Sequence, residues 1–491
     1  MNNKDLIFYE IYPTSFYDSN NDGIGDLNGI KEKLEYVKDL GFNAIWLNPF
    51  YKSPFKDGGY DVSDFFDVDP RFGTLKDFDE LINKAHRLGL KIIVDLVAGH
   101  ASMENPVFLE SAKAEKNKYS DLFIWSDSVW TPRQDIDLIR GLYERDGGFG
   151  VNFFAMQPAF NFGFDQINYP WQMSYKDERT FVAREYLLDI MKFWLKRGAD
   201  GFRVDMAASL VKNDDWFNKP ATVEVWHYLF DVIRKEFPKA YFVSEWGTTP
   251  DIAFKAGFDA DFILNNDNTS FNRMVYRNNR FFDNQDVDET LNIIRRDLEF
   301  AKQYDKSLAI ISGNHDTLRI ANKLDKKELK MYYMYLLSMP GTPFIYYGDE
   351  IGMKSANLTS KDGGYGRTGS RTPMQWNTSQ NAGFSKTDKE LYLPVMKANS
   401  VNVEDNLKDN DSLLNFIKQM ISIRKEYKEL KENDLEIYND GGLITFKRNK
   451  IALYMNLSDR VISIDEKKVI IHSGKNKKEL LNKESVLVHL N

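Results

Sequence analysis

Cysteine is absent from this chain of 491 residues. Without thiols, neither a disulfide framework nor a thiolate metal site can form, and the redox state of the compartment is left open. Long apolar runs are missing as well, since no window reaches the ~18 apolar residues of a membrane-spanning helix. The first residues also lack the basic and then apolar pattern of a signal peptide. We therefore expect a cytoplasmic protein with no membrane partner.

Concentrated positive charge is also lacking. The formal net charge is -8, from 65 basic and 73 acidic residues that are interspersed along the chain. A nucleic-acid partner would require a basic face, so this class of function is not expected. Aromatic residues, by contrast, are plentiful at 14%, and the hydrophobic share of 42% is ample for a packed core. These features indicate a soluble protein that acts on a small or neutral ligand.

Short apolar segments alternate with amphipathic helical stretches along most of the chain. This alternation is typical of a parallel sheet, and eight such units predict an α/β fold of the (β/α)8 TIM barrel type rather than a doubly wound sheet. The strand-like segments are IFYEIYP, AIWLNP, KIIVDLV, GFRVDM, YFVSEW, DADFILN, LAIISGN and PFIYYGDEIG. Helices are expected near residues 27–40, 75–88, 179–197, 222–236, 287–304, 326–338 and 411–428.

The alternation breaks in two places, which predicts three domains. Residues 98–165 are rich in Asn, Gly, Asp and aromatics and read as a lobe inserted after the third strand, a domain B. Residues 1–97 and 166–428 would form the barrel. Residues 429–491 contain short alternating segments such as GLITFKR and IALYMNL, which predict a C-terminal antiparallel β domain, a small β-sandwich.

Acidic residues follow three of the strand-like runs: Asp205 in GFRVDM, Glu245 in YFVSEWG and Asp316 in AIISGNHD. A parallel barrel brings the C-terminal ends of its strands to one rim, so these carboxylates could meet over one pocket. A retaining glycosidase requires such a pair, with a nucleophile and an acid ~5 to 5.5 Å apart. Any three acidic residues could be solvated charges, but the flanking residues favour the catalytic interpretation.

Several motifs occur in a familiar order, from IYPTSFYDSNNDGIGDLNGI through DGFRVDM to RTPMQWNTSQNAGF. Over nearly its whole length the chain resembles the α-amylase superfamily of glycoside hydrolases (family 13), and within it the α-glucosidase and oligo-1,6-glucosidase branch. The resemblance implies a retaining α-glycosidase. It makes Asp205 the nucleophile, Glu245 the general acid/base and Asp316 a residue that distorts the sugar.

The resemblance also assigns substrate contacts. Arg203 would orient the nucleophile, since residues two apart on a strand share a face. Tyr60 would stack on the sugar, and Asp57 with Arg367 would clamp a terminal hydroxyl. The histidines His100 and His315 would bind sugar hydroxyls. As alternatives, Arg203 and Asp205 could be a structural ion pair, and GGYD and NHD could be turn sequences.

A loop near the N-terminus has the alternating oxygen donors of a calcium site, with Gly23 for a sharp turn. The donors are Asp18, Asn20, Asp22, the carbonyl of Ile24, and Asp26. The resemblance implies a structural Ca²⁺ here; the alternative is a polar turn before a helix. A second calcium site known in α-amylases is not carried over, because Gly99 stands where they have an Asn ligand. No organic cofactor is expected.

The expected substrates are short α-gluco-oligosaccharides with α-1,4 or α-1,6 linkages. The linkage is left open by Met206, which matches neither the Val nor the small residue of the branch, and by Ala159, Phe160 and Trp246. A transglycosylase or isomerase of the trehalose synthase type would use the same residues. A non-catalytic amylase-like interaction module, such as the heavy subunit of amino-acid transporters, is a further alternative, although these lack parts of the carboxylate set.

Overall fold

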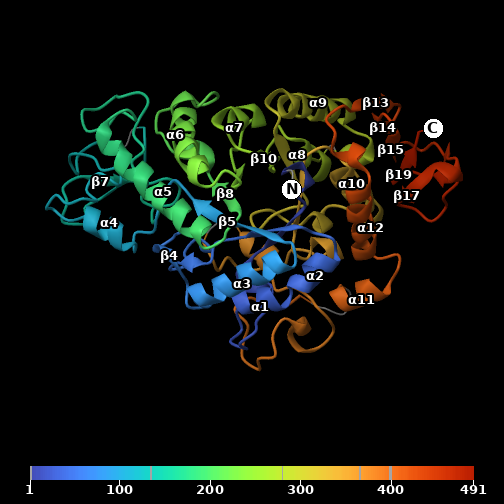
Figure 1. The fold of residues 1–491 in the computed structure, drawn as a ribbon, viewed down its shortest axis with the longest axis horizontal. Helices are drawn as coiled ribbons and strands as arrows, with labels where there is room; N and C mark the ends of the chain where they lie inside the picture. The colour runs from blue at the N-terminus through green and yellow to red at the C-terminus, as the bar shows by residue number, and fades with distance from the viewer. Residues whose placement is uncertain (1–2, 133–134, 279, 364–365, 397–400, 491) are drawn as a thin grey trace.

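The computed structural model describes residues 3–132, 135–278, 280–363, 366–396 and 401–490. Its centre is a closed barrel of eight parallel strands in the order β1-β12-β11-β10-β9-β8-β5-β2 (Figure 1). The strands are β1 (Phe8–Ile11), β2 (Ala44–Leu47), β5 (Lys91–Val97), β8 (Gly201–Asp205), β9 (Tyr241–Ser244), β10 (Ala260–Phe262), β11 (Ser307–Ile311) and β12 (Thr342–Tyr346). They coincide with the eight predicted segments, so the TIM barrel prediction is confirmed.

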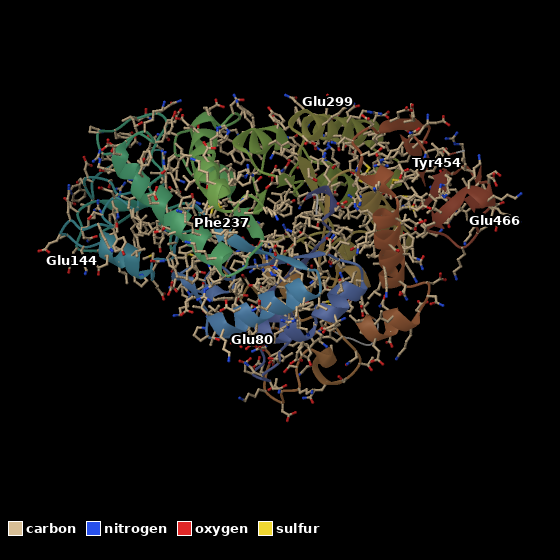
Figure 2. The ribbon with its side chains drawn as sticks, in the orientation of Figure 1. Glu80, Glu144, Phe237, Glu299, Tyr454 and Glu466 are labelled. Carbon is tan, nitrogen blue, oxygen red and sulfur yellow. The ribbon has the colours of Figure 1, made fainter. Side chains whose placement is uncertain are left out.

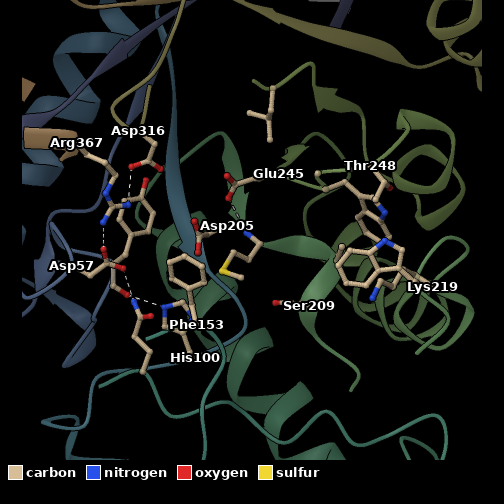
Figure 3. Close-up of a pocket in the computed structure, with 18 residues that line it drawn as sticks. Asp57, His100, Phe153, Asp205, Ser209, Lys219, Glu245, Thr248, Asp316 and Arg367 are labelled. Carbon is tan, nitrogen blue, oxygen red and sulfur yellow. Dashed lines mark hydrogen bonds and ion pairs between the residues drawn. The ribbon is translucent and has the colours of Figure 1, made fainter. Parts of the chain in front are cut away.

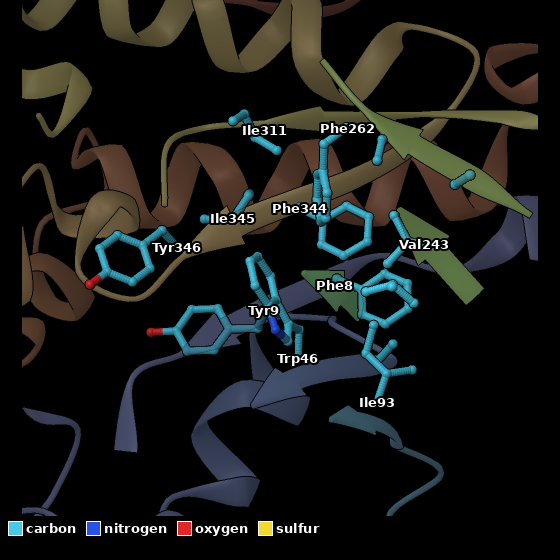
Figure 4. Close-up of a cluster of buried hydrophobic side chains, with 14 of the residues drawn as sticks. Phe8, Tyr9, Trp46, Ile93, Val243, Phe262, Ile311, Phe344, Ile345 and Tyr346 are labelled. Atoms are coloured by element: carbon cyan, nitrogen blue, oxygen red, sulfur yellow. The ribbon is translucent and has the colours of Figure 1, made fainter. Parts of the chain in front are cut away.

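The barrel strands are buried almost throughout, which explains their nearly continuous apolar sequences. One side faces the barrel interior and the other faces the surrounding helices, so neither side calls for polar residues. The interior is filled by aromatic rings: Phe344 stacks on Phe8 at 4.3 Å and contacts Phe262 at 4.8 Å, and Trp46 lies 5.3 Å from Phe262 (Figure 4). Because the interior is solid, a ligand can enter only at the rim.

Helices cover the outside of the barrel. The longer ones are α3 (Leu75–Arg87), α5 (Phe181–Lys196), α6 (Pro220–Glu236), α9 (Val287–Tyr304), α10 (Lys326–Ser338) and α12 (Leu413–Glu426), with shorter α7 (Pro250–Ala256), α8 (Ser270–Val275) and α11 (Val403–Lys408). Capping boxes start α3 at Thr74 and α10 at Asp325. No helix in the described ranges combines the length and apolar content needed to cross a membrane.

The single helix predicted over 27–40 is wrong in detail. The structure has α1 (Leu27–Glu32) and α2 (Leu34–Asp39), divided at Lys33, whose backbone is not helical. The amide of Lys33 bonds to the carbonyls of both Gly29 and Ile30, which tightens the turn in the manner of a 3₁₀ segment.

The segment between β5 and β8 contains α4 (Pro106–Ser111), β6 (Leu138–Arg140) and β7 (Gly148–Gly150), and projects at the left of Figure 1. A bridge between His100 and Ala159 attaches this lobe at the end of β5. A hairpin of β3 (Tyr51–Lys52) and β4 (Asp64–Val68) follows β2. The insertion after the third strand is confirmed.

The C-terminal part forms a five-stranded antiparallel sheet, as predicted, in the order β13-β14-β15-β19-β17. Its strands are β13 (Glu436–Asp440), β14 (Leu443–Arg448), β15 (Ile451–Asn456), β19 (Glu484–His489) and β17 (Val469–His472), and β16 (Ile462–Ser463) pairs with β18 (Glu479–Leu480). Figure 2 shows Glu144 of the lobe and Glu466, in the turn before β17, at opposite ends of the molecule. The three predicted domain boundaries stay predictions.

Arginines join the C-terminal sheet to the barrel at the end of α10. Arg424 of α12 donates to the carbonyls of Leu337 and Met339 at 2.9 and 2.8 Å. Arg448 of β14 donates to the carbonyl of Ser338 at 2.6 Å. The last carbonyls of a helix have no partners within it, and cations suit this end of the helix dipole. The two buried guanidinium groups therefore complete α10 and hold three elements together.

Candidate active site

The strand β8 carries Arg203 and Asp205, and its pairing with β5 places Arg203 opposite Asp95. One guanidinium nitrogen of Arg203 lies 2.9 Å from Asp95 Oδ1 and 2.7 Å from Asp205 Oδ1. The other lies 2.9 Å from Oε2 of Glu245, directly after β9. Met206 has a left-handed backbone, and its amide donates to the same Glu245 oxygen at 3.1 Å. A single buried arginine thus gathers three carboxyl groups from three adjacent strands.

The charges of this cluster are unbalanced, because three carboxyl groups surround one guanidinium. Burial raises the pKa of Asp205 well above its usual range; Arg203 opposes this, and Glu245 and Asp95 add to it. Burial likewise raises the pKa of Asp95, against the charge of Arg203. Neighbouring carboxyl groups of this kind titrate as a unit. The cluster therefore favours a state in which one carboxyl keeps its proton while another is ionised.

His315 and Asp316 follow β11 and lie beside this cluster. Asp316 Oδ1 accepts from Arg367 at 2.9 Å and from Arg371 at 2.8 Å, and its other oxygen lies 3.2 Å from His315 Nε2. His315 Nδ1 lies 2.9 Å from Glu10 Oε1. Burial lowers the pKa of His315, but Asp316 and Glu10 outweigh it and raise the pKa to about 9. His315 is therefore a cation at neutral pH.

Asp57 and Arg367, which the resemblance assigned jointly to a terminal sugar hydroxyl, form an ion pair with each other. Asp57 also accepts from Gln157 Nε2 of the inserted lobe at 2.6 Å. Gly58, where the family commonly has Asn, has a positive φ of 58°, and an added Cβ would lie 2.2 Å from Arg371 Nη1. A side chain at this position would therefore have to displace the end of the Arg371 side chain.

Tyr60 and His100 are brought to the same site, but with protein partners of their own. The Tyr60 ring stacks on His315 at 5.2 Å, and its hydroxyl donates to Asp95 at 3.0 Å. The parts of the Tyr60 ring that do not contact His315 or Asp95 are the ones that could contact a sugar. His100 Nε2 lies 3.2 Å from the carbonyl of Tyr60. Burial lowers the pKa of His100 to about 3, so its imidazole is neutral at physiological pH.

These groups surround one pocket of about 640 Å³ at the C-terminal rim of the barrel (Figure 3). Asp57, Asp316 and Arg367 lie at one side of Asp205 and Glu245, and Lys219 and Thr248 lie at the other. Of the predicted residues, those lining the pocket are Asp57, Tyr60, His100, Asp205, Glu245, Asp316 and Arg367, whereas Arg203 and His315 support them from behind. The end of the pocket with Asp57, Asp316 and Arg367 is charged, and the lining also includes the apolar side chains of Phe153, Met206, Trp216, Trp246 and Leu264.

Several residues of the site were missed by the sequence reasoning. Glu10 had a signal, because it is a charged residue inside the strand-like run IFYEIYP and is fully buried beside His315. Arg371 lies within the RTPMQW motif. Gln157 lies in the motif segment MQPAFNF, which also contains Ala159 and Phe160. Trp216 had no such signal, since it comes from an irregular segment whose approach to the pocket depends on tertiary structure.

The predicted calcium loop is stabilised largely by its own hydrogen bonds. Asp18 accepts from the amides of Asn21 and Gly23 at 2.7 and 2.8 Å. Asp26 accepts from the amide of Gly29 at 2.7 Å and so caps α1. No group of three or more acidic or histidine side chains among the described residues is arranged to hold a metal. A cation here would depend on the oxygens of Asn20 and Ile24 as well, and the calcium site stays a prediction.

Comparison with known proteins adds an independent line of evidence. A family model described as the catalytic domain of alpha amylase matches residues 10–433. The trehalose synthase/amylase TreS of Mycolicibacterium smegmatis is 33% identical over 483 residues, which cover 86% of this chain and 76% of that protein. An oligo-1,6-glucosidase of Parageobacillus thermoglucosidasius is 30% identical, covering 90% and 85%. The crystal structure of the trehalose-6-phosphate hydrolase TreA of Bacillus licheniformis covers 99% of both chains, with a TM-score of 0.82 and 25% identity.

Proposed function

Because the chain belongs to the α-amylase catalytic-domain family of glycosidases, we propose that it hydrolyses α-glucosidic bonds of short α-gluco-oligosaccharides with retention of configuration. The observation that carries the proposal is the pair of carboxyl groups, Asp205 and Glu245, held by the one guanidinium of Arg203 at the pocket. Because both carboxyl groups bind the same guanidinium group, they lie close to each other. Retaining enzymes place their carboxyl groups ~5 to 5.5 Å apart, whereas inverting enzymes leave ~6.5 to 9.5 Å for a water.

In the proposed reaction, Asp205 attacks the anomeric carbon while Glu245 gives its proton to the departing glycosidic oxygen. The bond between that oxygen and the anomeric carbon breaks, and a glucosyl ester of Asp205 forms. Glu245, now ionised, takes a proton from water, whose oxygen attacks the anomeric carbon and releases Asp205. Two displacements at one carbon give net retention.

The surrounding groups would hold the sugar in position for this path. The cationic His315 and the paired Arg367 keep Asp316 ionised and oriented, which would help distort the ring toward the flattened geometry of the transition state. His100 would contribute a neutral hydrogen-bond donor. The predicted calcium ion has no part in these steps, because its loop contributes no residue to the lining of the pocket.

Transfer of the glucosyl group to a sugar, as in trehalose synthases, is the second candidate. A TreS protein is among the relatives of this chain. The apolar side chains of the lining, such as Phe153, Trp246 and Leu264, would favour retention of a released sugar and exclusion of water. The same two carboxyl groups serve both reactions, so the acceptor decides between them.

Product analysis tests both candidates. The purified protein is incubated separately with maltose, isomaltose, sucrose and trehalose, and the anomers are followed by proton NMR. Initial release of α-glucose supports a retaining hydrolase and identifies the linkage. A new disaccharide without net glucose supports the transferase, and initial β-glucose contradicts retention.

Replacement of the nucleophile is the matching genetic test. Asp205→Asn is expected to abolish turnover, because the amide keeps the shape but loses the anionic nucleophile. Circular dichroism and the melting temperature check that the fold is intact. Normal activity of this variant would contradict the mechanism. The control is Asp297→Asn, which alters a buried carboxylate on α9 away from the pocket.

A further inference from the structure

Asn152 of the inserted lobe lies between His100 and the half-buried Lys212. Its side-chain Nδ2 is 3.1 Å from His100 Nδ1, and its Oδ1 is 2.6 Å from Lys212 Nζ. The same Nδ2 lies 3.2 Å from the hydroxyl of Ser209. His100 comes shortly after β5 and Lys212 shortly after β8, so Asn152 connects the segments that follow two barrel strands beside the pocket.

Lys212 determines which way this amide faces. Burial lowers the pKa of Lys212 to about 7, so at pH 6 its side chain is mainly an ammonium group, which can only donate hydrogen bonds. It is directed at Asn152 Oδ1 and, at 2.5 Å, at the carbonyl of Ser209. The oxygen of the amide must therefore face the lysine, and its NH₂ group must face the histidine. The orientation follows from the donor chemistry of the neighbour.

The orientation of the amide in turn determines the tautomer of His100. A neutral imidazole has one donor and one acceptor nitrogen, and the NH₂ group of Asn152 can only donate. Nδ1 must therefore be the acceptor, which leaves the proton on Nε2. That nitrogen faces the carbonyl of Tyr60 at 3.2 Å, and His100 lines the pocket.

Gly99 provides the space that this arrangement needs. An added Cβ at this position would lie 2.7 Å from Asn152 Nδ2 and 3.1 Å from Ser209 Oγ. A contact below 3.0 Å would force the amide to move. The glycine at position 99, which departs from the family motif, therefore makes room for the hydrogen bonds of Asn152.

We propose that Asn152 is a positioning residue: oriented by Lys212, it holds His100 Nδ1 as an acceptor, so that Nε2 carries the proton, which it donates to the carbonyl of Tyr60 and, when a sugar is bound, shares with a sugar hydroxyl. The donation to a sugar rests on the proposed function. The hydrogen-bond chain itself does not, because it lies wholly within the protein.

The test is the protonation of His100 in the full-length protein labelled with ¹⁵N-histidine. A long-range ¹H–¹⁵N spectrum at pH 6 distinguishes protonated from unprotonated ring nitrogens, and His100→Gln identifies the signals. The wild type is expected to show an unprotonated Nδ1 and a protonated Nε2. A proton on Nδ1 would overturn the proposal. Because this measurement needs no substrate, it tests the hydrogen-bond chain even if the protein cleaves no glucoside.

Two variants test the part of Asn152. In Asn152→Asp the carboxylate only accepts, so Nδ1 of His100 is expected to gain a proton, and kcat/KM to fall about ten- to a hundredfold on the substrate identified above. An unprotonated Nδ1 would contradict the proposal. If this variant does not fold, Asn152→Ala is used, whose Nδ1 signal should move because its donor is lost; an unmoved signal would overturn the proposal. Asn218→Asp, an exposed change of the same kind, should leave the spectrum unaltered.

Discussion

Glu245 and Asp205 share one arginine but differ in their access to the pocket. The side chain of Glu245 is 23% exposed and that of Asp205 is 11% exposed. A general acid/base must reach the leaving oxygen first and a water afterwards, whereas a nucleophile must reach one carbon of the bound sugar. The more open position therefore suits the proton-transfer role.

This difference predicts a leaving-group effect in Glu245→Gln. General acid catalysis contributes about 10² to 10⁴ in rate, and we expect a kcat loss of this size on a disaccharide. The loss should be much smaller on 4-nitrophenyl α-glucoside, whose phenolate leaves without protonation. Steady-state kinetics on both substrates make the comparison. Glu236→Gln, at the last residue of α6, is the control. Equal losses on both substrates would contradict the assignment.

His315 predicts a pH dependence of stability. Its pKa in the folded protein is about 9, above its ordinary 6.5. A raised pKa means that the folded state binds the proton more tightly, so the stabilisation is full below pH 6.5 and is lost as pH rises through about 9. His315→Gln should flatten this fall. Melting temperatures from pH 6 to pH 10 at one scan rate measure it, with the exposed His227→Gln as control; parallel curves for variant and wild type would refute it.

Among the secondary-structure elements, the loop over residues 18–26 connects parts of the chain that are far apart in sequence. The amide of Asp18 donates to the carbonyl of Phe384 at 3.0 Å, and its carboxylate accepts from Ser385 Oγ at 2.6 Å. Asp26 at the other end caps α1. A cation here would strengthen a junction between the first barrel helix and the late loop, which makes its expected effect structural.

The corresponding prediction concerns metal removal. A chelator should lower the melting temperature, and added Ca²⁺ should restore it, because a ligand that binds the folded state alone stabilises it. The rate at the assay temperature should be unchanged. Differential scanning calorimetry with and without EDTA measures the shift, and Asp22→Ala should abolish the response. An identical melting temperature in all conditions would exclude an occupied site.

At the scale of the whole molecule, the charged end of the pocket is built from segments distant in sequence. Asp57 follows β2, Gln157 belongs to the inserted lobe, and Arg367 comes from the loop after β12. Their contacts with one another and with Asp316 lie across this end. A linear chain of sugars extending past the site in this direction would meet the ion pair.

Because these contacts close one end of the pocket, we predict that the enzyme cleaves oligosaccharides at their chain end. With maltoheptaose, the first products should be glucose and maltohexaose, because one glucosyl unit fills the charged end. Chromatography of early time points measures this. A maltoheptaose blocked at its non-reducing end is the matched control and should resist cleavage. Intermediate oligosaccharides at early times would show internal cleavage instead.

Much of this protein was determined by its sequence alone. Strand periodicity and buried apolar runs are local properties, so the eight barrel strands were predicted within a few residues. The sequence also predicted that Asp205, Glu245 and Asp316 lie close together, because each follows a strand and parallel strands bring their C-terminal ends to one rim.

Tertiary structure decided what depends on contacts between distant segments. An added Cβ at Gly58 would displace Arg371, and one at Gly99 would displace Asn152. The apolar part of the pocket lining includes residues such as Trp216 that belong to no motif. The physical reason is that periodicity records which side of an element is buried, whereas the partner of each side chain is set only when the chain closes and packs.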